Sequence, residues 1–511
     1  MTFTQSDIQE KKEGIKLYDY QHDAIEQIFE RLDKYPKKHN LLYQLPTGGG
    51  KTVIFSKIAK RYIEETKKKV LILTHRIELS KQTSDMLAEF GVENKIINSK
   101  VKKIDVKDEH MCYVAMVETL NNRLQEDKVG LKNVGLIIID EAHYNSFNKL
   151  FKFFEDRVML GVTATPLSSS NKFPMRDTYD ELIVGHSITE LIEKGFLSQA
   201  TTFNYDVNLN SLTIGINGDY TVSSSERLYT NDEMLDIILR AYNERSKGKK
   251  VLVFNNGIKT SQEVCRVFTQ AGLEVKHLDN KNTEAERQEI LTWFKETPQA
   301  ILTSVGILTT GFDEPTIDTI ILNRATKSLT LYHQMIGRGS RITKTKGDFT
   351  VIDLGNNMLR FGQWEEHVDW DQIFRAPDAY LESIVSDAEL QKQFKYIMPD
   401  HVKEQFSKTK KMDFDIKLEY ENALSKGKRP MFAINKSIQN HTKMVKQNAD
   451  DLMGAITLAK LLNEDIEYRV KNYSYCIVKS TKSYVEWLIE DYKRKLNLAL
   501  QEEFANIEVD S

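Results

Sequence analysis

The feature that most constrains this chain is a glycine-rich loop placed between a strand and a helix. Residues 44–52 read QLPTGGGKT, after the apolar run 41–43 and before a helical pattern over residues 53–59. Glycines let backbone N–H groups converge on one point without Cβ clashes, and the start of a helix adds the positive end of its dipole. The loop therefore predicts a phosphate-binding turn, in which Lys51 reaches the β- and γ-phosphates and the Thr52 hydroxyl ligates Mg²⁺.

The loop departs from the general phosphate-loop pattern at its first position, where Leu45 stands in place of glycine. An ordinary glycine turn is the alternative, but Gly-Lys-Thr at a strand-to-helix junction favours nucleotide binding. The loop residues predicted to bind nucleotide are Thr47, Gly48, Gly49, Gly50, Lys51 and Thr52.

Length and composition limit the class of protein. A chain of 511 residues is too long for one hydrophobic core, so we expect roughly two to four domains. Because the net charge is -3, any contact with nucleic acid must come from local patches. Cys112, Cys265 and Cys476 are isolated, which argues against a zinc module or a disulfide framework and fits a reducing, cytoplasmic compartment. Residues 1–14 lack an apolar signal core, and no apolar run approaches membrane-spanning length.

An acidic pair follows a strand that reads as buried on both faces. Residues 136–139 are apolar and lead into Asp140 and Glu141. Acidic groups just past an apolar strand, in a chain with a phosphate loop, are typical of a site for Mg²⁺ and the attacking water. We expect Asp140 to hold the metal and Glu141 to deprotonate the water. Thr163 and Thr165, after the strand that begins at 160, are placed to bond this pair and sense the nucleotide.

Polar residues follow the other apolar strands of this half, where ligands sit in an open parallel sheet. Arg76 follows the strand over residues 70–74, and Thr119 stands near the end of a predicted strand over residues 114–120. An ordinary loop surface is an equal alternative for both. Gln21 lies upstream of the phosphate loop, and its amide could pair with adenine N6 and N7, although most glutamines are solvated surface residues.

The alternation of strands and helices restarts after a polar, glycine-containing segment over residues 201–229. Strands are predicted over residues 249–254, 300–304 and 319–323, with a helix over 258–268. No second phosphate loop is present in this half. A second α/β unit of this kind must contribute to a shared site or do something else.

Residues 334–341, QMIGRGSR, suggest the shared site. Arg338 and Arg341 are three residues apart, so on a helix they would lie on one face and could be aimed together at a phosphate. An Arg-x-x-Arg helix is usually a solvated face, but Gly337 and Gly339 allow close approach. An arginine acting on a γ-phosphate is worth roughly 10³–10⁵ in rate.

Taken in order, these stretches resemble the motifs of superfamily 2 helicases of the DEAH-box type, over roughly residues 17–357. The segment 308–341, followed by 351–356, looks most like RadD-type DNA-repair helicases and the motor subunits of type I restriction enzymes. RadD-type proteins carry cysteine-rich zinc-binding segments after the motor, and this chain has none. The motifs that carry the resemblance are Gln21 (Q motif), 44–52 (I), 74–76 (Ia), Thr119 (Ib), 140–143 (II), 163–165 (III), 251–258 (IV), 307–315 (V) and 334–341 (VI).

The resemblance implies two tandem RecA-like domains, with ATP and Mg²⁺ bound between them. By position, Lys51, Asp140, Glu141, Gln334, Arg338 and Arg341 would be catalytic, with Gln334 positioning water. Thr52 and Asp140 would hold the metal, and Gly311 and Asp313 would link nucleotide to nucleic acid. His143, Thr163 and Thr165 would couple the two sites. The predicted nucleic-acid contacts are Arg76, Thr119, Thr303 and Thr309.

We therefore expect an α/β protein with a first RecA-like domain over residues 1–200, a second over 201–375 and a mainly α-helical domain over 376–511. Trp364, Trp370 and Phe374 are expected to pack on the second domain. Residues 425–447 contain six cations and no acid. They could form a phosphate-contacting surface, with a solvated helix face at least as plausible.

The interpretation that follows is an ATP-driven DNA helicase or translocase. DNA is favoured over RNA by the resemblance of motifs V and VI alone. An RNA helicase and an ATP-gated nucleic-acid clamp that unwinds nothing are the alternatives. The sequence indicates no membrane association and identifies no protein partner.

Overall fold

The structure is a computed structural model that describes most of the chain. Thr310, which belongs to the predicted motif V, lies outside the described residues, as do residues 1–14. The described residues run from 16 to 509, except 36–38, 102–107, 127–130, 155–156, 171, 206, 310, 345, 388, 391–397, 410–411, 413 and 478–481.

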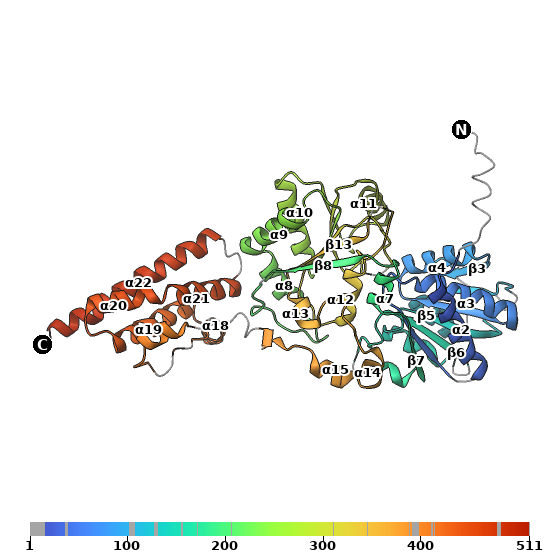
Figure 1. Cartoon of the computed structure of the whole chain (residues 1–511), viewed down its shortest axis with the longest axis horizontal. Helices are drawn as coiled ribbons and strands as arrows, with labels where there is room; N and C mark the ends of the chain where they lie inside the picture. The colour runs from blue at the N-terminus through green and yellow to red at the C-terminus, as the bar shows by residue number, and fades with distance from the viewer. Residues whose placement is uncertain are drawn as a thin grey trace.

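Two parallel sheets form two α/β lobes, and a helical region follows them, as the sequence predicts. In Figure 1 the first lobe, the second lobe and the helical region lie in a row, with the C-terminus at the end of the helical region. None of the described helices is long and apolar enough to cross a membrane. The domain limits at 200 and 375 and the cytoplasmic location stay predictions.

The first sheet has seven strands in the order β3-β4-β2-β5-β6-β1-β7. Side chains alternate between two buried clusters: Ile72 and Ile138 face one cluster, and Leu71 and Ile137 face the other. A sheet covered on both faces needs apolar residues at successive positions, which is why these strands read as continuous apolar runs. The strands are β1 (Leu41–Gln44), β2 (Lys69–Thr74), β3 (Asn94–Ile97), β4 (Cys112–Met116), β5 (Val134–Asp140), β6 (Val158–Thr163) and β7 (Glu181–Val184).

The second sheet has six strands in the order β10-β11-β9-β12-β13-β8. Its edge strand β8 begins two residues before the stretch that the sequence indicated only as a polar segment and runs into it. The strand was missed because it carries threonines and an asparagine instead of an apolar run. The strands are β8 (Gln199–Asn204), β9 (Val251–Asn255), β10 (Val275–Leu278), β11 (Ile301–Val305), β12 (Thr319–Asn323) and β13 (Asp348–Asp353).

Helices cover both sheets and connect their parallel strands. In the first lobe they are α2 (Asp19–Lys34), α3 (Lys51–Thr66), α4 (Ile77–Glu89), α5 (Val117–Gln125), η2 (Asn145–Phe147), α6 (Asn148–Phe151), η3 (Met175–Asp177) and α7 (Ile188–Glu193). In the second lobe and just after it they are α8 (Val222–Tyr229), α9 (Asp232–Arg245), α10 (Ile258–Gln270), α11 (Glu284–Glu296), α12 (Leu329–Ile336), α13 (Asn357–Phe361), α14 (Trp370–Arg375) and α15 (Pro377–Ser383).

A segment that we call the strap, residues 364–375, returns from the second lobe to the first. Trp364 packs edge-on against Phe349 of β13 with ring centroids 5.9 Å apart. Farther along, α14 packs on β7 and η3 of the first lobe, and Phe374 joins the buried cluster that contains Tyr179. The prediction that Phe374 packs on the second domain is therefore wrong, because its helix lies on the other lobe.

The helical region folds around the long helix α22, which packs along α19, α20 and α21. Its core contains a buried ionic network: Asp465 Oδ2 lies 2.7 Å from Arg469 Nη2 and 2.9 Å from His441 Nε2. Burial lowers the pKa of His441 to about 4, so the ring is neutral at pH 7. The helices are α17 (Asp400–Gln405), α18 (Ile416–Ser425), α19 (Phe432–Asn448), α20 (Leu452–Leu461), α21 (Asn463–Cys476) and α22 (Lys482–Val509).

Replacing Asp465 by alanine should destabilise the helical region by about 3–5 kcal/mol, because the buried Arg469 charge would lose its counter-charge. Urea unfolding of the full chain, followed by far-UV circular dichroism, measures the change. Asp450→Ala is the matched control, since the Asp450 side chain is 97% exposed and should shift stability by less than about 0.5 kcal/mol. Equal stability of the two variants would contradict this account of the network.

A candidate nucleotide site where the lobes meet

The glycine loop lies between β1 and α3 and takes the conformation that its sequence requires. Gly48 and Gly50 have φ of +91° and +84°, values that L side chains rarely adopt. Gly50 is the N-cap of α3, so the loop delivers backbone N–H groups and the positive end of the helix to one place. Leu45 is fully buried, and a Cβ on Gly49 would meet its side chain at 2.8 Å. Leu45, which departs from the family pattern, therefore packs against Gly49 and supports the loop.

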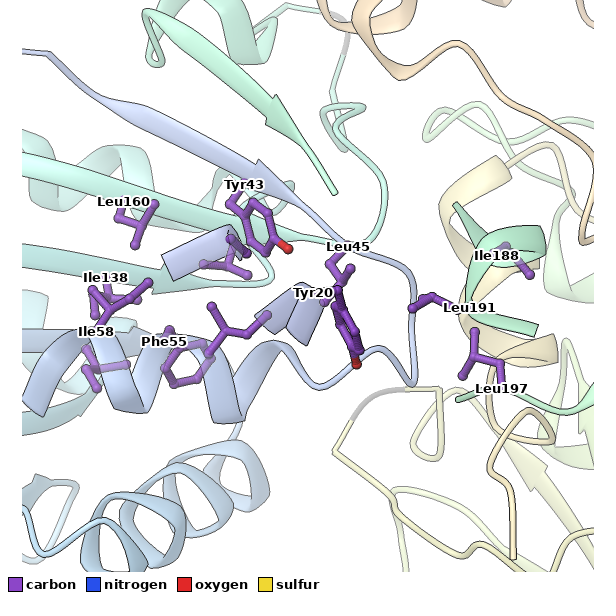
Figure 2. Packing of buried hydrophobic residues seen from close by; sticks show 14 of the residues in the cluster. Tyr20, Tyr43, Leu45, Phe55, Ile58, Ile138, Leu160, Ile188, Leu191 and Leu197 are labelled. Carbon is purple, nitrogen blue, oxygen red and sulfur yellow. The ribbon is translucent and has the colours of Figure 1, made fainter. Parts of the chain in front are cut away.

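Tyr20 and Gln21 of α2 lie beside this loop. The Tyr20 hydroxyl donates to Gly49 O at 2.9 Å, and Figure 2 shows the Tyr20 ring beside the loop, near the side chains of α7. Gln21 is buried, and its Oε1 accepts from Tyr18 N at 3.0 Å. The predicted adenine reader thus caps its own helix in this structure, while its Nε2 stays next to Gly50. The sequence did not single out Tyr20, although its place beside Gln21 was a usable signal.

Lys51 points into the loop that it follows. Its Nζ donates to Leu45 O at 3.2 Å and to Pro46 O at 3.4 Å. Burial lowers the pKa of Lys51, and the nearby carboxylates of Glu141 and Asp140 oppose this shift. An ammonium whose hydrogen-bond partners among the described residues are carbonyl oxygens is electrostatically suited to an anion.

The acidic pair lies at the end of β5, under the phosphate loop. Asp140 Oδ1 accepts from Glu141 N at 3.0 Å, and both side chains are buried. Burial and the neighbouring Glu141 charge raise the pKa of Asp140. Burial would also raise the pKa of Glu141, but the positive charge of Lys51 leads a set of neighbours that lower it. Glu141 has a left-handed φ of +52°, which is uncommon for a residue with a side chain and costs of order 1–3 kcal/mol.

The second lobe reaches this site through the turn that follows α12. Arg341 Nη1 donates to Gly48 O at 2.8 Å, and Arg341 Nε lies 3.0 Å from Asp313 Oδ1. Gly337 touches the loop so closely that a Cβ would lie 2.6 Å from Thr47 Cβ. The turn and the phosphate loop are therefore in direct contact.

The remaining motif VI residues point to the same place. Arg338 Nη1 donates to Phe312 O at 2.5 Å, and burial lowers the pKa of Arg338 to about 10, with the Arg341 charge adding to the effect. Gln334 Nε2 lies 3.5 Å from Glu141 Oε2. The sequence placed the arginines on one helix face, and this is wrong: α12 ends at Ile336, and the arginines follow in the turn that Gly337 begins.

The predicted bonds of Thr163 and Thr165 to the acidic pair are not found among the described residues; motif III instead connects His143, in the loop of Glu141, to the second lobe. Thr163 Oγ1 donates to Thr165 O at 3.0 Å and shares a 2.9 Å hydrogen bond with His143 Nδ1. Thr165 Oγ1 donates to Thr330 Oγ1 of α12 at 2.9 Å. A path of hydrogen bonds therefore runs from the loop of Glu141 to the helix that precedes the arginines.

Two of the four predicted nucleic-acid contacts are half-buried and two are buried. Arg76 and Thr119 are half-buried at the ends of β2 and β4, although Thr119 lies in α5 and not on the predicted strand, which ends at Met116. Thr303 is fully buried and bonds Asn255 Nδ2 and Ser261 Oγ, both at 2.8 Å. A direct contact of Thr303 with nucleic acid is therefore wrong for this structure. Thr309 is 4% exposed and donates to Gly306 O.

Contacts near Arg76 also connect the two lobes. Arg76 donates from Nη1 to Ile307 O at 2.9 Å and from Nη2 to Gly306 O at 3.2 Å. Glu78 of α4 pairs with Arg287 of α11 at 2.5 Å. Gly311 has φ of +74° and faces Glu78, so motif V lies against the first lobe as well.

The basic segment over residues 425–447 has two kinds of cation. Lys436 pairs with Glu419 at 2.7 Å and Lys446 pairs with Glu503, so these two serve the helical bundle. Lys426 and Arg429 are exposed in the turn between α18 and α19. The phosphate-contacting surface stays a prediction, and Lys443 of α19 is exposed as well.

Comparisons with known proteins agree with this arrangement. Residues 14–168 match the family described as "Type III restriction enzyme, res subunit", and residues 231–343 match "Helicase conserved C-terminal domain". The chain is 31% identical to the "Putative ATP-dependent helicase IRC3" of Saccharomyces cerevisiae, over 66% of this chain and 51% of that protein. It is 25% identical to the "Type I restriction enzyme EcoAI endonuclease subunit" of Escherichia coli, over 65% of this chain and 45% of that protein.

A solved structure shares the fold over nearly the whole chain. The type ISP restriction-modification enzyme LlaBIII, solved bound to DNA, superposes with a TM-score of 0.51 at 16% identity. The superposition covers 96% of this chain and 40% of that enzyme. This chain therefore spans about half or less of the length of these three proteins.

Gly50→Ala should weaken ATP binding and lower stability, because a Cβ there would lie 2.5 Å from Gln21 Nε2 in a strained backbone. Gly91→Ala is the matched control: Gly91 has φ of +75° but open space around it. Both variants should lose about 1–2 kcal/mol of stability in urea unfolding. Isothermal titration with ATP should show a loss of affinity in Gly50→Ala only. Equal ATP affinity in the two variants would contradict the placement of nucleotide at Gly50.

Proposed function

Because the chain is a superfamily 2 helicase related to the motor subunits of type I restriction enzymes, we propose that it hydrolyses ATP where its two lobes meet and uses the energy to move along or separate DNA strands. The observation that carries the proposal is the contact of Arg341 with the phosphate loop across the lobe junction. A guanidinium held by Asp313 of one lobe and bonded to the phosphate loop of the other could reach the γ-phosphate of an ATP bound by that loop.

The loop residues 47–50 and Lys51 would bind the phosphates of ATP. Lys51 Nζ donates to backbone carbonyl oxygens, which a phosphate would replace with a stronger, charge-assisted partner. Arg338 and Arg341 would stabilise the charge that develops on the transferred phosphoryl group.

Thr52 and Asp140 would hold Mg²⁺. One hydroxyl and one carboxylate form a small oxygen donor set, which suits a cation that keeps several waters and takes phosphate oxygens as ligands. Among the described residues, no cluster of three or more His, Cys, Asp or Glu could hold a metal, so a site built by protein groups alone is not expected there. When bound, Mg²⁺ would neutralise charge on the phosphates.

Glu141 would take the proton of the attacking water, and Gln334 would orient that water with it. The two side chains come from different lobes and lie 3.5 Å apart at Nε2 and Oε2. Complete assembly of the catalytic groups thus requires that the lobes be closed. This requirement gives a physical basis for coupling the nucleotide state to movement of the lobes.

Nucleic acid would contact the strand ends that carry Arg76 and Thr119. DNA is the substrate that we propose, from the resemblance of motifs V and VI to type I restriction motors. An RNA helicase and an ATP-gated clamp are the alternatives that the experiments below distinguish.

Glu141→Gln should lower kcat for ATP hydrolysis by about 10²–10⁴-fold and leave ATP binding nearly unchanged, because the amide keeps the shape but cannot accept the proton. Steady-state phosphate release and ATP titration separate the two effects. Glu30→Gln, which alters a side chain that is 71% exposed on α2, should behave like the wild type. Substantial turnover in Glu141→Gln would exclude Glu141 as the base.

ATPase activity should rise when nucleic acid is added, and more with DNA than with RNA. The measurement compares single-stranded DNA, duplex DNA, forked DNA and RNA at one stated salt concentration, since phosphate contacts are strongly salt-dependent. Lys51→Ala is the background control. Stronger stimulation by RNA would reverse the substrate proposal, and stimulation without strand displacement or translocation would favour the clamp.

A further inference from the structure

Three aromatic rings form a tilted stack beside Glu141. The His75 ring packs against the Tyr144 ring with centroids 4.2 Å apart and planes tilted by 37°, and Tyr144 packs against His143 with centroids 4.3 Å apart and planes tilted by 39°. The stack joins two loops: His75 follows β2, while His143 and Tyr144 follow β5. These strands are neighbours in the sheet, so their loops leave it side by side.

His75 has an unusual environment for a histidine. Both ring nitrogens are buried, and neither has a hydrogen-bond partner among the described residues. Burial lowers the pKa of His75 to about 4, so the ring is neutral at pH 7. A buried polar group without a partner costs about 1–3 kcal/mol. The contact that His75 does make is the ring stack, which indicates that the flat ring is what the site uses.

Two residues of the stack, His75 and Tyr144, lead to different functional regions. On one side, the next residue, Arg76, binds Gly306 O and Ile307 O of the second lobe. On the other, Tyr144 N donates to Glu141 O at 3.1 Å and closes the turn in which Glu141 has its left-handed backbone. A turn held in such a conformation persists only when its surroundings fix it.

We propose that His75 is a positioning residue for hydrolysis: its ring clamps Tyr144, so that the loop carrying Arg76 sets the position of Glu141. The contact of Arg76 with the second lobe, and with nucleic acid on that side, is thereby transmitted to the group that activates water. This proposal rests on the proposed function of Glu141 and extends it. It adds a mechanical link that the motif residues alone do not supply.

The first test separates the ring from its nitrogens. His75→Ala removes the ring, and His75→Phe restores a flat ring without nitrogens. We expect His75→Ala to lower the DNA-stimulated kcat by about 10–100-fold, the size of effect caused by misplacing a catalytic group by about 1 Å. The KM for ATP should stay within about twofold, and His75→Phe should recover most of kcat. His39→Ala, on the far edge of the sheet beside Glu181, is the matched control and should keep full activity.

The outcomes are distinct. An unchanged kcat in His75→Ala, an equal loss in the Ala and Phe variants, or a rise in KM alone would each overturn the proposal. If His75→Ala unfolds at a lower temperature, its loss of kcat also includes lost stability. The test then rests on the kcat of His75→Phe, which keeps a ring at this position. Absence of ATP hydrolysis in the wild type would instead refute the proposed function.

The second test asks whether His75 and Arg76 act along one path. Each single variant to alanine should lower the DNA-stimulated kcat, and the double variant should be no slower than the slower single variant. Effects along a shared path are non-additive, whereas independent effects multiply. A double variant whose loss equals the product of the two single losses would overturn the mechanical link.

Discussion

The arrangement of the site depends on one guanidinium group that crosses from one lobe to the other. Arg341 is held by Asp313 and binds the carbonyl oxygen of Gly48. This contact is sterically feasible only because the facing surfaces lack side chains at critical points: Gly337 lies against Thr47, and Gly48 lies against Ser340. Glycines on both sides of the junction therefore serve close approach as much as loop flexibility.

Two buried cations, Arg338 and Lys51, lie at this junction. Arg338 is buried and lies near the like charge of Arg341, and both effects lower its pKa, while its Nη1 donates to Phe312 O. Lys51 is likewise buried among carbonyl oxygens. Neither cation has a salt bridge to a carboxylate among the described residues, although the charges of Glu141 and Asp140 favour the charged form of Lys51. A polyphosphate bound here would add a direct, charge-assisted partner for these buried cations.

The sequence predicted the elements whose local pattern is strong and missed those that depend on neighbours. The phosphate loop and the buried strands could be predicted because glycine turns and long apolar runs leave a local signal. The order of the motifs could be seen directly in the sequence. The strand β8 could not, since an edge strand needs few apolar residues.

The errors in the site have similar causes. Thr303 was assigned to nucleic acid through the family resemblance, but the alternation of β11 turns it toward Ser261 of α10. The arginines were assigned to a helix because spacing of three suits one, yet Gly337 ends that helix. The aromatic stack on His75 joins residues about 70 positions apart in sequence, and no single-chain pattern indicates such a contact.

The strap has a consequence for how far the two lobes can separate. Since α14 packs on β7 while Trp364 packs on Phe349 of β13, the polypeptide spans the junction between the lobes. Any movement that parts the two sheets must either pivot about this span or strip α14 from β7. The strap would therefore limit the amplitude of lobe opening.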